Sequence, residues 1–364
     1  MGEITSFMSK GIPPKYVERE NENTVCVLNQ KCNRNFEIKY EESRLHDCSK
    51  KKVPADKMLQ PGDVLINSTG TGTAGRVAQL YDVPTPTTID GHMILLRPTE
   101  EIDSIYYGYA VKAFQPKIET LAEGSTGQTE INRKRLQEEI VISFPKEKET
   151  QERIARFLLN IDEKIKVNDK INKNLEQQAQ AIFLKMFPDI FSASASSSFQ
   201  NLIEFSNGKK RPETIGNIPV YGGNGVLAYT NQSNAENCVI IGRVGAYCGN
   251  TFLCPEKCWT SDNAIQAKSK NEDSPLFIYY LLRNASLPSR HIGTGQPLMT
   301  QAILNAIPVN EPSTQEIRSF INICTPLHET IFANEKQNIS LALLRDTLLP
   351  KLMSGELDVS DIDL

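Results

Sequence analysis

The fold is decided by residues 148–186, KETQERIARFLLNIDEKIKVNDKINKNLEQQAQAIFLKM, and by residues 314–352, which repeat their pattern. Steps of three and four residues alternate along both stretches, which is typical of a coiled-coil seam rather than a globular amphipathic helix. The first seam comprises Ile154, Leu158, Ile161, Ile165, Asn168, Asn172, Leu175, Ala179, Ile182 and Met186. The second seam comprises Phe320, Cys324, Leu327, Ile331, Asn334, Asn338, Leu341, Arg345, Leu348 and Leu352.

Each position of the second seam follows its counterpart by about 166 residues, which indicates an internal duplication. The polar pair Asn168/Asn172 recurs as Asn334/Asn338, and Asn at a core position fixes register at a cost in stability. We therefore predict two long helices that pair antiparallel and hold a globular block at each end. The residues predicted to pair are Ile161, Ile165, Asn168, Asn172 and Leu175 with Leu327, Ile331, Asn334, Asn338 and Leu341. The alternative is two unrelated helices, each packed on its own globule.

A globular block precedes each seam, so the chain reads as globule and helix, twice. We divide it into residues 1–147, 148–190, 191–312 and 313–364, the last including a C-terminal tail. Alternating apolar patterns predict strands in both blocks. The predicted strands are 25–29, 63–68, 76–81, 92–98, 141–145, 218–223, 238–245 and 247–254, and the predicted block helices are 104–114, 130–140 and 274–285. The fold class is α+β, with two mixed α/β domains in a pseudo-two-fold repeat. Pro326 predicts a kink or a late start in the second long helix.

Composition excludes several classes of protein. The chain has 364 residues, of which 39% are hydrophobic, enough for real cores. No apolar run approaches the ~18 residues of a membrane span, and no export signal is evident, so we expect a cytoplasmic protein. The eight cysteines are too sparse for a disulfide scaffold. The net charge of −4 argues weakly against a nucleic-acid binder, but basic clusters at 50–52, 133–135 and 209–211 allow a local basic face.

Catalytic signatures are missing from the sequence. The run GTGTAGR at 70–76 lacks the Lys-Ser/Thr pair of a P-loop, and its GxGxxG spacing lies in a β context. Cys238, Cys248, Cys254 and Cys258 have irregular spacing, which favours buried thiols over zinc. The four histidines have neither metal nor triad spacing. We therefore predict no catalytic residue, no metal and no cofactor in this chain.

Polar, glycine-rich loops are the remaining candidates for a site. Backbone amides and hydroxyls suit phosphates, whereas Arg, Lys, Asn and Gln suit base edges in the major groove. The candidates in block one are Ser68, Thr69, Thr71, Thr73, Arg76, Ser125, Thr126, Gln128, Arg133, Lys134 and Arg135. Those in block two are Lys209, Lys210, Arg211, Tyr221, Asn224, Arg243, Tyr247, Arg290, Thr294 and Gln296. Ordinary turns are the alternative, although Thr-Gly-Gln recurs at 126–128 and 294–296.

Four stretches together resemble the specificity subunit of type I DNA restriction-modification systems. They are PGDVLINSTGTGTAGRVA (61–78), STGQTEINRKRL (125–136), QERIARFLLNIDEKI (151–165) and LLPKLMSGEL (348–357). The resemblance implies that each block is a target-recognition domain for half of a split double-stranded DNA site. It also implies that the helices are spacers.

The same resemblance implies partners for the helices. Two modification subunits, which use S-adenosylmethionine to methylate adenine, would dock on them, and ATP-dependent restriction subunits would join later. One departure is that block one begins almost at Met1, with no preceding helical leader. The alternative function is a non-enzymatic coiled-coil scaffold with two ligand-binding β-rich domains.

Overall fold

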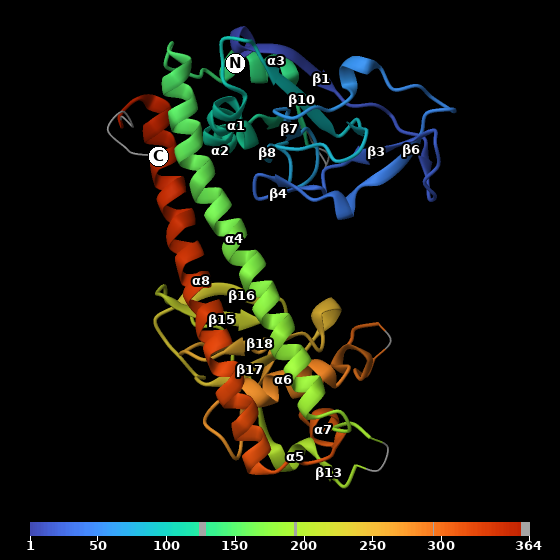
Figure 1. Ribbon diagram of the computed structural model, residues 1–364, viewed down its shortest axis with the longest axis vertical. Coiled ribbons are helices and arrows are strands. Elements are labelled where there is room, and N and C mark those ends of the chain that lie inside the picture. The colour runs from blue at the N-terminus through green and yellow to red at the C-terminus, as the bar shows by residue number, and fades with distance from the viewer. Residues whose placement is uncertain (124–128, 193–194, 294, 358–364) are drawn as a thin grey trace. The chain divides into compact units, whose positions relative to one another are not determined.

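The computed structural model describes residues 1–364 except 124–128, 193–194, 294 and 358–364 (Figure 1). The chain forms two compact units, Met1–Lys166 with Gln337–Leu364, and Val167–Lys336. The division runs through both long helices, α4 (Lys148–Met186) and α8 (Thr314–Ser354). Each unit therefore holds one globular domain and a part of each helix, whereas the sequence-based segments keep the helices whole.

The domain of the first unit is built on two four-stranded sheets. One has the antiparallel order β1-β10-β7-β8, from strands Thr5–Lys10, Met93–Pro98, Val64–Asn67 and Val77–Gln79. The other has the order β2-β6-β3-β9, from strands Tyr16–Val17, Arg44–Asp47, Thr24–Leu28 and Thr87–Ile89. Two further two-stranded antiparallel sheets pair β4 (Asn33–Arg34) with β5 (Glu37–Ile38) and β11 (Ala122–Glu123) with β12 (Glu130–Ile131).

Helices cover the first sheet of this domain (Figure 1). They are α1 (Ser104–Ala113), α2 (Gln115–Thr120) and α3 (Arg133–Glu139), with 3-10 turns at Gly2–Ile4, Tyr40–Glu42 and Ala55–Lys57. Asp103 caps α1 by accepting a hydrogen bond from the Tyr106 amide at 2.8 Å. The α1 tyrosines Tyr106, Tyr107 and Tyr109 are fully buried. They share one apolar core with strands β7 and β10 and with α4 and α8 residues such as Leu158 and Leu352.

The domain of the second unit repeats the first sheet. Its order β14-β20-β17-β18 uses strands Ile203–Asn207, Ala264–Ser269, Cys238–Gly242 and Thr251–Cys254. A three-stranded sheet β16-β15-β19 follows, from Gly225–Thr230, Ile218–Gly222 and Trp259–Thr260. The remaining elements are β13 (Ser197–Ser198), β21 (Pro308–Val309), α5 (Phe199–Leu202), α6 (Leu276–Asn284), α7 (Gln301–Asn305) and 3-10 turns at Gly245–Tyr247 and Leu287–Ser289.

The two long helices run antiparallel within each unit. In the first unit Asp162 of α4 pairs with Arg345 of α8, and in the second unit the Asn334 amide donates to Asn172 at 2.8 Å. Later residues of α4 thus meet earlier residues of α8. Of the seam residues predicted to pair, Ile161, Asn168 and Ile331 are buried, whereas Ile165, Asn172, Leu175, Leu327, Asn334, Asn338 and Leu341 are half-buried. Among the described residues, no helix has the length and apolar character needed to cross a bilayer.

One predicted strand is absent, and one of the two alternatives predicted for Pro326 is excluded. Residues 141–145 have no regular structure. Ile142 is buried in the core whereas Val141 is 70% exposed, so the alternating apolar residues anchor this segment on the core instead of pairing it with a strand. For Pro326 the prediction was a kink or a late start, and a late start is excluded because the second long helix begins at Thr314 and continues through Pro326. Its start is set by a capping box, in which the Ser313 amide donates to the Glu316 carboxylate at 2.8 Å and the Ser313 hydroxyl accepts from the Glu316 amide at 3.3 Å.

Candidate nucleic-acid interface

In the first domain, the loop between β7 and β8 meets the strand that precedes α3. The Ile131 amide donates to the Ser68 carbonyl at 2.8 Å, and Thr69 and Glu130 form an isolated bridge. Positive φ angles at Gly70 and Gly72, of 110° and 70°, turn the loop sharply, as glycine allows. Two of the polar segments singled out in the sequence, 68–76 and 130–135, therefore lie together.

The second domain repeats this frame. The loop between β17 and β18 meets the hairpin around Ile292 and Leu298, and the Met299 amide donates to the Arg243 carbonyl at 2.8 Å. Val244 and Leu298 form the counterpart of the Thr69–Glu130 bridge. Ser68 and Arg243 thus occupy equivalent backbone positions. The same loop frame carries different side chains in the two domains.

The hydroxyls of the β7–β8 loop are in different settings, and the buried Ser68 hydroxyl has no hydrogen-bond partner among the described residues. Ser68 is completely buried, the Thr69 hydroxyl lies 2.9 Å from His92 Nδ1, and the Thr73 hydroxyl donates to the Thr69 carbonyl at 3.4 Å. Thr71 is exposed, and the Arg76 guanidinium donates to the Gly72 carbonyl at 3.0 Å. Thr71 and Arg76 are therefore better placed to meet a ligand than the buried Ser68.

The three basic residues at the start of α3 differ in whether nearby carboxylates already bind them. Arg135 forms ion pairs with both Glu123 and Glu139, and Lys134 lies 3.7 Å from Glu138. Arg133 is exposed, and its guanidinium makes a long hydrogen bond of 3.5 Å to the Met8 carbonyl. Because carboxylates already neutralise Arg135, Arg133 is the stronger candidate for a phosphate or base contact. The predicted residues Ser125, Thr126, Gln128 and Thr294 lie outside the described residues.

In the second domain, the exposed basic run 209–211 begins where the chain passes Ser261. A Cβ on Gly208 would lie 1.9 Å from the Ser261 carbonyl oxygen, so only glycine fits there. The Lys209 amide donates to the Thr260 carbonyl at 3.0 Å, and the Trp259 indole donates to the Lys209 carbonyl at 3.2 Å. These bonds fix the backbone of the run, while the side chains of residues 209–211 remain exposed.

The other candidates of the second domain differ in exposure. Asn224, Gln296 and Arg290 are exposed, and 47% of Tyr247 is accessible. Arg243 is half-buried and donates to the Asp262 carbonyl at 3.4 Å, and Arg290 Nε donates to the Ala285 carbonyl at 2.7 Å. Tyr221 packs instead on a small buried cluster, with its ring centroid 6.2 Å from that of Phe252. The Tyr221 ring is therefore part of the domain interior and is a weaker candidate for ligand contact.

A pocket of about 240 Å³ beside Arg76 adds residues that the sequence reasoning missed. Its lining consists of Asn33, Arg34, Asn35, Phe36, Arg76, Val77 and Gln115. Asn35 and Phe36 have positive φ angles of 52° and 67°, which non-glycine residues rarely adopt. The Asn-Arg-Asn run at 33–35 was the available signal, since amide and guanidinium groups in a turn suit a polar ligand.

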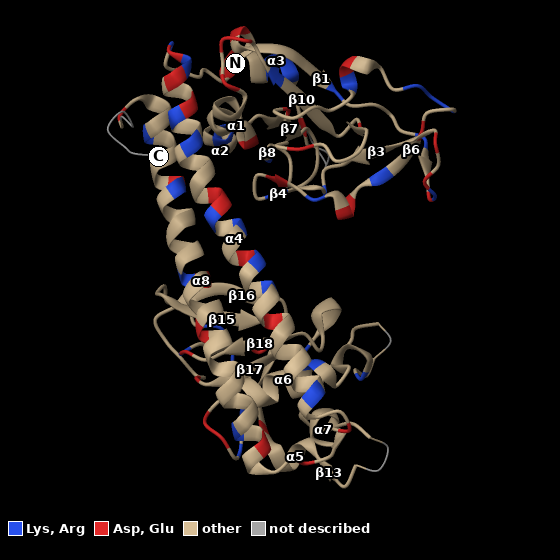
Figure 2. Cartoon of the chain, in the orientation of Figure 1, with Lys and Arg blue, Asp and Glu red and all other residues tan. Residues whose placement is uncertain are grey.

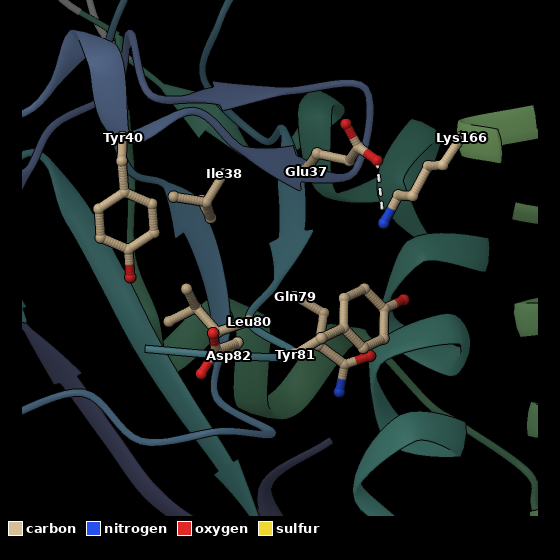
Figure 3. A pocket seen from close by; sticks show the side chains of 8 residues that line it. All are labelled: Glu37, Ile38, Tyr40, Gln79, Leu80, Tyr81, Asp82 and Lys166. Atoms are coloured by element: carbon tan, nitrogen blue, oxygen red, sulfur yellow. Dashed lines mark ion pairs between the residues drawn. The ribbon is translucent and has the colours of Figure 1, made fainter. Parts of the chain in front are cut away.

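Figure 3 shows a second pocket, of about 260 Å³, lined by Glu37, Ile38, Tyr40, Gln79, Leu80, Tyr81, Asp82 and Lys166. Lys166 of α4 lies 3.0 Å from the Glu37 carboxylate and sits over the Tyr81 ring. This pair connects the β5 strand to the long helix. Along α4, Lys and Arg alternate with Asp and Glu (Figure 2), so α4 presents no uniformly basic face.

The structure also groups three of the cysteines that sequence spacing treated as separate. The sulfur atoms of Cys238, Cys254 and Cys258 all lie within 4.8 Å of one another, and all three residues are buried. Hydrogen bonds from Cys254 and Cys258 lower the pKa of Cys238, and its sulfur raises the pKa of Cys254. Cys248 lies elsewhere and donates to the Arg243 carbonyl at 3.4 Å.

Comparison with known proteins gives the same layout as the fold. Residues 1–177 and 199–342 match the family described as the type I restriction modification DNA specificity domain. A crystal structure of a type I restriction-modification S subunit from M. genitalium has a TM-score of 0.57 at 20% identity, covering 97% of this chain and 94% of that one. No curated protein matches the sequence.

Two further solved structures are similar at lower scores. One, described as the structural basis of complex assembly and conformational transition of the type I R-M system, has a TM-score of 0.46 and 14% identity, covering 98% and 97% of the two chains. The HsdS subunit from Thermoanaerobacter tengcongensis has a TM-score of 0.37 and 13% identity, covering 98% and 96%. The two segments that match the family model span most of the chain and include both domains. The chain therefore belongs to the type I restriction-modification DNA specificity family.

Proposed function

We propose that the two domains each read one half of a split double-stranded DNA site, as the specificity subunit of a type I restriction-modification complex. The observation that carries this proposal is the repeated loop frame, in which Ile131 meets Ser68 and Met299 meets Arg243 through equivalent 2.8 Å hydrogen bonds. Two similar frames with different side chains suit two different half-sites. A coiled-coil scaffold with unrelated ligand-binding domains is not favoured, because both domains match the same family.

The chemistry of the loops suits contact with DNA rather than catalysis. Exposed cations at Arg133 and at residues 209–211 would neutralise phosphates, and Asn224 and Gln296 offer amides to base edges. In this proposal the chain has no catalytic group or cofactor of its own. S-adenosylmethionine and ATP would bind partner subunits, and the complex would act in the cytoplasm.

The long helices would provide the surface for two modification subunits, with restriction subunits joining the assembly. On α8, Ile339 and Leu343 are 66% and 68% exposed and lie four residues apart, so they share a helix face. Leu344 beside them is 46% exposed, and the α8 ribbon carries few charges (Figure 2). Exposed apolar residues on a helix that is already paired mark a surface for another protein.

A domain exchange tests the proposed reading of the DNA. Residues 199–312 are replaced by the matching block of a relative with a known site, and the variant is expressed with its modification subunits. Genome-wide mapping of adenine methylation should then show one altered half of the motif. The matched control replaces residues 1–147 and should alter the other half. A change in both halves from either exchange would contradict independent recognition.

Binding measurements test the proposed partners. Because the net charge is −4, we expect the isolated chain to bind its site weakly and to gain affinity when the modification subunits are added. Binding should weaken steeply with salt, since each neutralised phosphate releases counterions. The double variant Ile339→Ser, Leu343→Ser should lose assembly with those subunits, whereas Ser340→Ala, which removes no exposed apolar side chain, should keep it. Tight binding by the chain alone, unchanged by the partners, would overturn this part.

A further inference from the structure

Three cysteines converge inside the domain of the second unit. Cys238, Cys254 and Cys258 are 0%, 2% and 0% exposed, and their sulfur atoms lie within 4.8 Å of one another. We propose that these three thiols bind one zinc ion as thiolates, forming a structural metal site in the second recognition domain. The proposal does not depend on the DNA-reading function, because it concerns the stability of the domain.

The β17–β18 hairpin and the turn after it bring the three sulfur atoms together. Cys238 begins β17 and Cys254 ends β18, and the two residues are directly opposed in the antiparallel pair. Cys258 arrives through a short turn and is held by two backbone hydrogen bonds with Ala235, of 3.1 and 2.9 Å. The sites of all three ligands are thus fixed by backbone pairing. Such preorganisation favours metal binding over three independently placed thiols.

At the equivalent place in the first domain, an ion pair and a larger apolar core stand where the second domain has the three cysteines. Asp63 begins the matching strand region there, and its carboxylate pairs with Arg97 at 2.7 Å. The neighbouring core comprises the larger set Cys26, Leu28, Cys32, Leu59, Leu65, Leu80, Ile89, Met93 and Leu95. The core around the three cysteines comprises only Ala235, Cys238, Ile240, Cys254, Cys258 and Ala264. A core this small gains most from a metal, which links its strands more strongly than alanine and thiol packing does.

The three sulfur ligands favour zinc as the bound metal. Thiolates are soft ligands that suit Zn²⁺, and Zn–S bonds of about 2.3 Å place tetrahedral sulfur atoms about 3.8 Å apart, within the limit observed here. Binding would form three Zn–S bonds and release one proton from each thiol, so no oxidant is needed. Water or the phenol of Tyr221, whose ring packs on the cluster, would complete the tetrahedron.

A disulfide is the main competing use of these residues. Opposed cysteines of an antiparallel pair, such as Cys238 and Cys254, lie at a separation that a disulfide can span. A disulfide would lower the intact mass by two hydrogens and would leave Cys258 alone. The two outcomes are therefore distinguishable in one preparation.

The experiment measures zinc in the full chain, purified under reducing conditions from cells grown with added Zn²⁺. Elemental analysis should give about one zinc per chain, and titration of the metal-free chain with Co²⁺ should give the absorption bands of a tetrahedral thiolate site. Cys238→Ser, Cys254→Ser and Cys258→Ser should each lower bound zinc at least about tenfold. Cys324→Ser, which removes a buried thiol of the same unit outside the cluster, should leave the zinc content unchanged.

Misfolded variants would not decide the matter alone, so the unaltered chain supplies an independent measurement. Removing the metal with a chelator should lower its melting temperature, and adding back Zn²⁺ should restore it. A chain that binds no stoichiometric Zn²⁺ or Co²⁺ in its reduced form would overturn the proposal. So would a Cys238–Cys254 disulfide in protein prepared without oxidant, or equal loss of zinc in Cys324→Ser.

Discussion

The junction between domain and helix pair is built differently in the two units. In the first unit, the Tyr109 hydroxyl of α1 donates to Asp162 of α4 at 2.6 Å, and the same carboxylate pairs with Arg345 of α8. In the second unit, the Tyr280 hydroxyl of α6 lies 2.8 Å from Nε2 of His328 on α8. Asp162 and His328 are separated by about 166 residues, the period of the duplication. A tyrosine thus meets equivalent helix positions with different chemistry.

The Asp162 contact is ionic, whereas the equivalent Tyr280–His328 contact is neutral and aromatic, although Arg283 of α6 pairs with Glu176 of α4 beside it. Lys112 lies near Asp162 and Arg345, and burial lowers its pKa to about 8. Burial lowers the pKa of His328 to about 4, so this imidazole is neutral at pH 7. Around it, the rings of Phe183, Tyr280 and Phe320 pack with centroids 5.5 to 6.0 Å apart. A duplicated backbone frame therefore accepts either ion pairs or ring packing at the same place.

The largest effect is expected from removing the centre of the aromatic junction. Phe183 is completely buried and contacts the rings of Phe187, Phe277, Tyr280 and Phe320. Phe183→Ala should lower the free energy of unfolding by about 3–5 kcal/mol, through lost burial and the cavity left behind. Denaturant unfolding of the full chain measures this. The neighbour Leu184, 52% exposed, is the control, and Leu184→Ala should change stability by less than about 0.5 kcal/mol.

Breaking the ionic junction should cost somewhat less. Asp162→Ala leaves Arg345 without this carboxylate and Lys112 without the attraction of its charge, and uncompensated buried charge costs about 3 kcal/mol. Arg345 keeps Asp346 at 2.8 Å, which limits the loss. Denaturant unfolding again provides the measurement, with the exposed Glu163→Ala as control. Equal stability of the two variants would show that the ion pair contributes nothing and would remove the contrast between junctions.

Lowering the pH should destabilise the second junction through His328. The folded pKa of His328, about 4, lies below the unfolded value of about 6.5, so between these pH values the unfolded chain binds the extra proton. Stability from this group is therefore lost as pH falls from about 6.5 towards 4, by up to about 3 kcal/mol. Glu176 partly opposes the shift and Arg283 reinforces it.

His328→Gln keeps a polar partner for Tyr280 but does not titrate. The difference in unfolding free energy between this variant and the unaltered chain should therefore shrink or reverse on going from pH 7 to pH 5. All other titrating groups are shared and cancel in that difference. A difference that is the same at both pH values would show that His328 is not held neutral.

The smallest effect is expected in the basic run of α3. Arg133→Ala should weaken DNA binding by the assembled complex by about 1–3 kcal/mol if Arg133 meets a base edge, relaxing one position of the site. Arg135→Ala is the matched control on the same helix, and its effect should be smaller because Glu123 and Glu139 already bind that guanidinium. Affinities at two salt concentrations measure both variants. A larger loss in Arg135→Ala would reverse the ranking given by the ion pairs.

The repeated periodicity made the two long helices and their antiparallel pairing predictable, whereas the long-range pairing of strands was not visible in the sequence. Strands such as Val64–Asn67 were predictable from their apolar runs. The sheet β2-β6-β3-β9 was not, because its strands are short and its parallel pairing joins Cys26 to Thr87 across the intervening chain. The same limit hid the cysteine cluster, since Cys238 and Cys254 meet only because β17 lies beside β18. For the candidate site, residue types were predictable, but the ion pairs of Arg135 and the burial of Ser68 required coordinates.

The division of the chain into units has a consequence for the order of folding during synthesis. The second unit is continuous in sequence, Val167–Lys336, but the first needs Gln337–Leu364 as well as Met1–Lys166. Leu158 of α4 shares its core with Leu349 and Leu352 of α8. At roughly 5–20 residues per second, a ribosome takes on the order of 10–40 s to pass from Lys166 to the end of α8. During that interval the apolar face around Leu158 has no helix partner from the end of the chain. The half that is translated first is finished last.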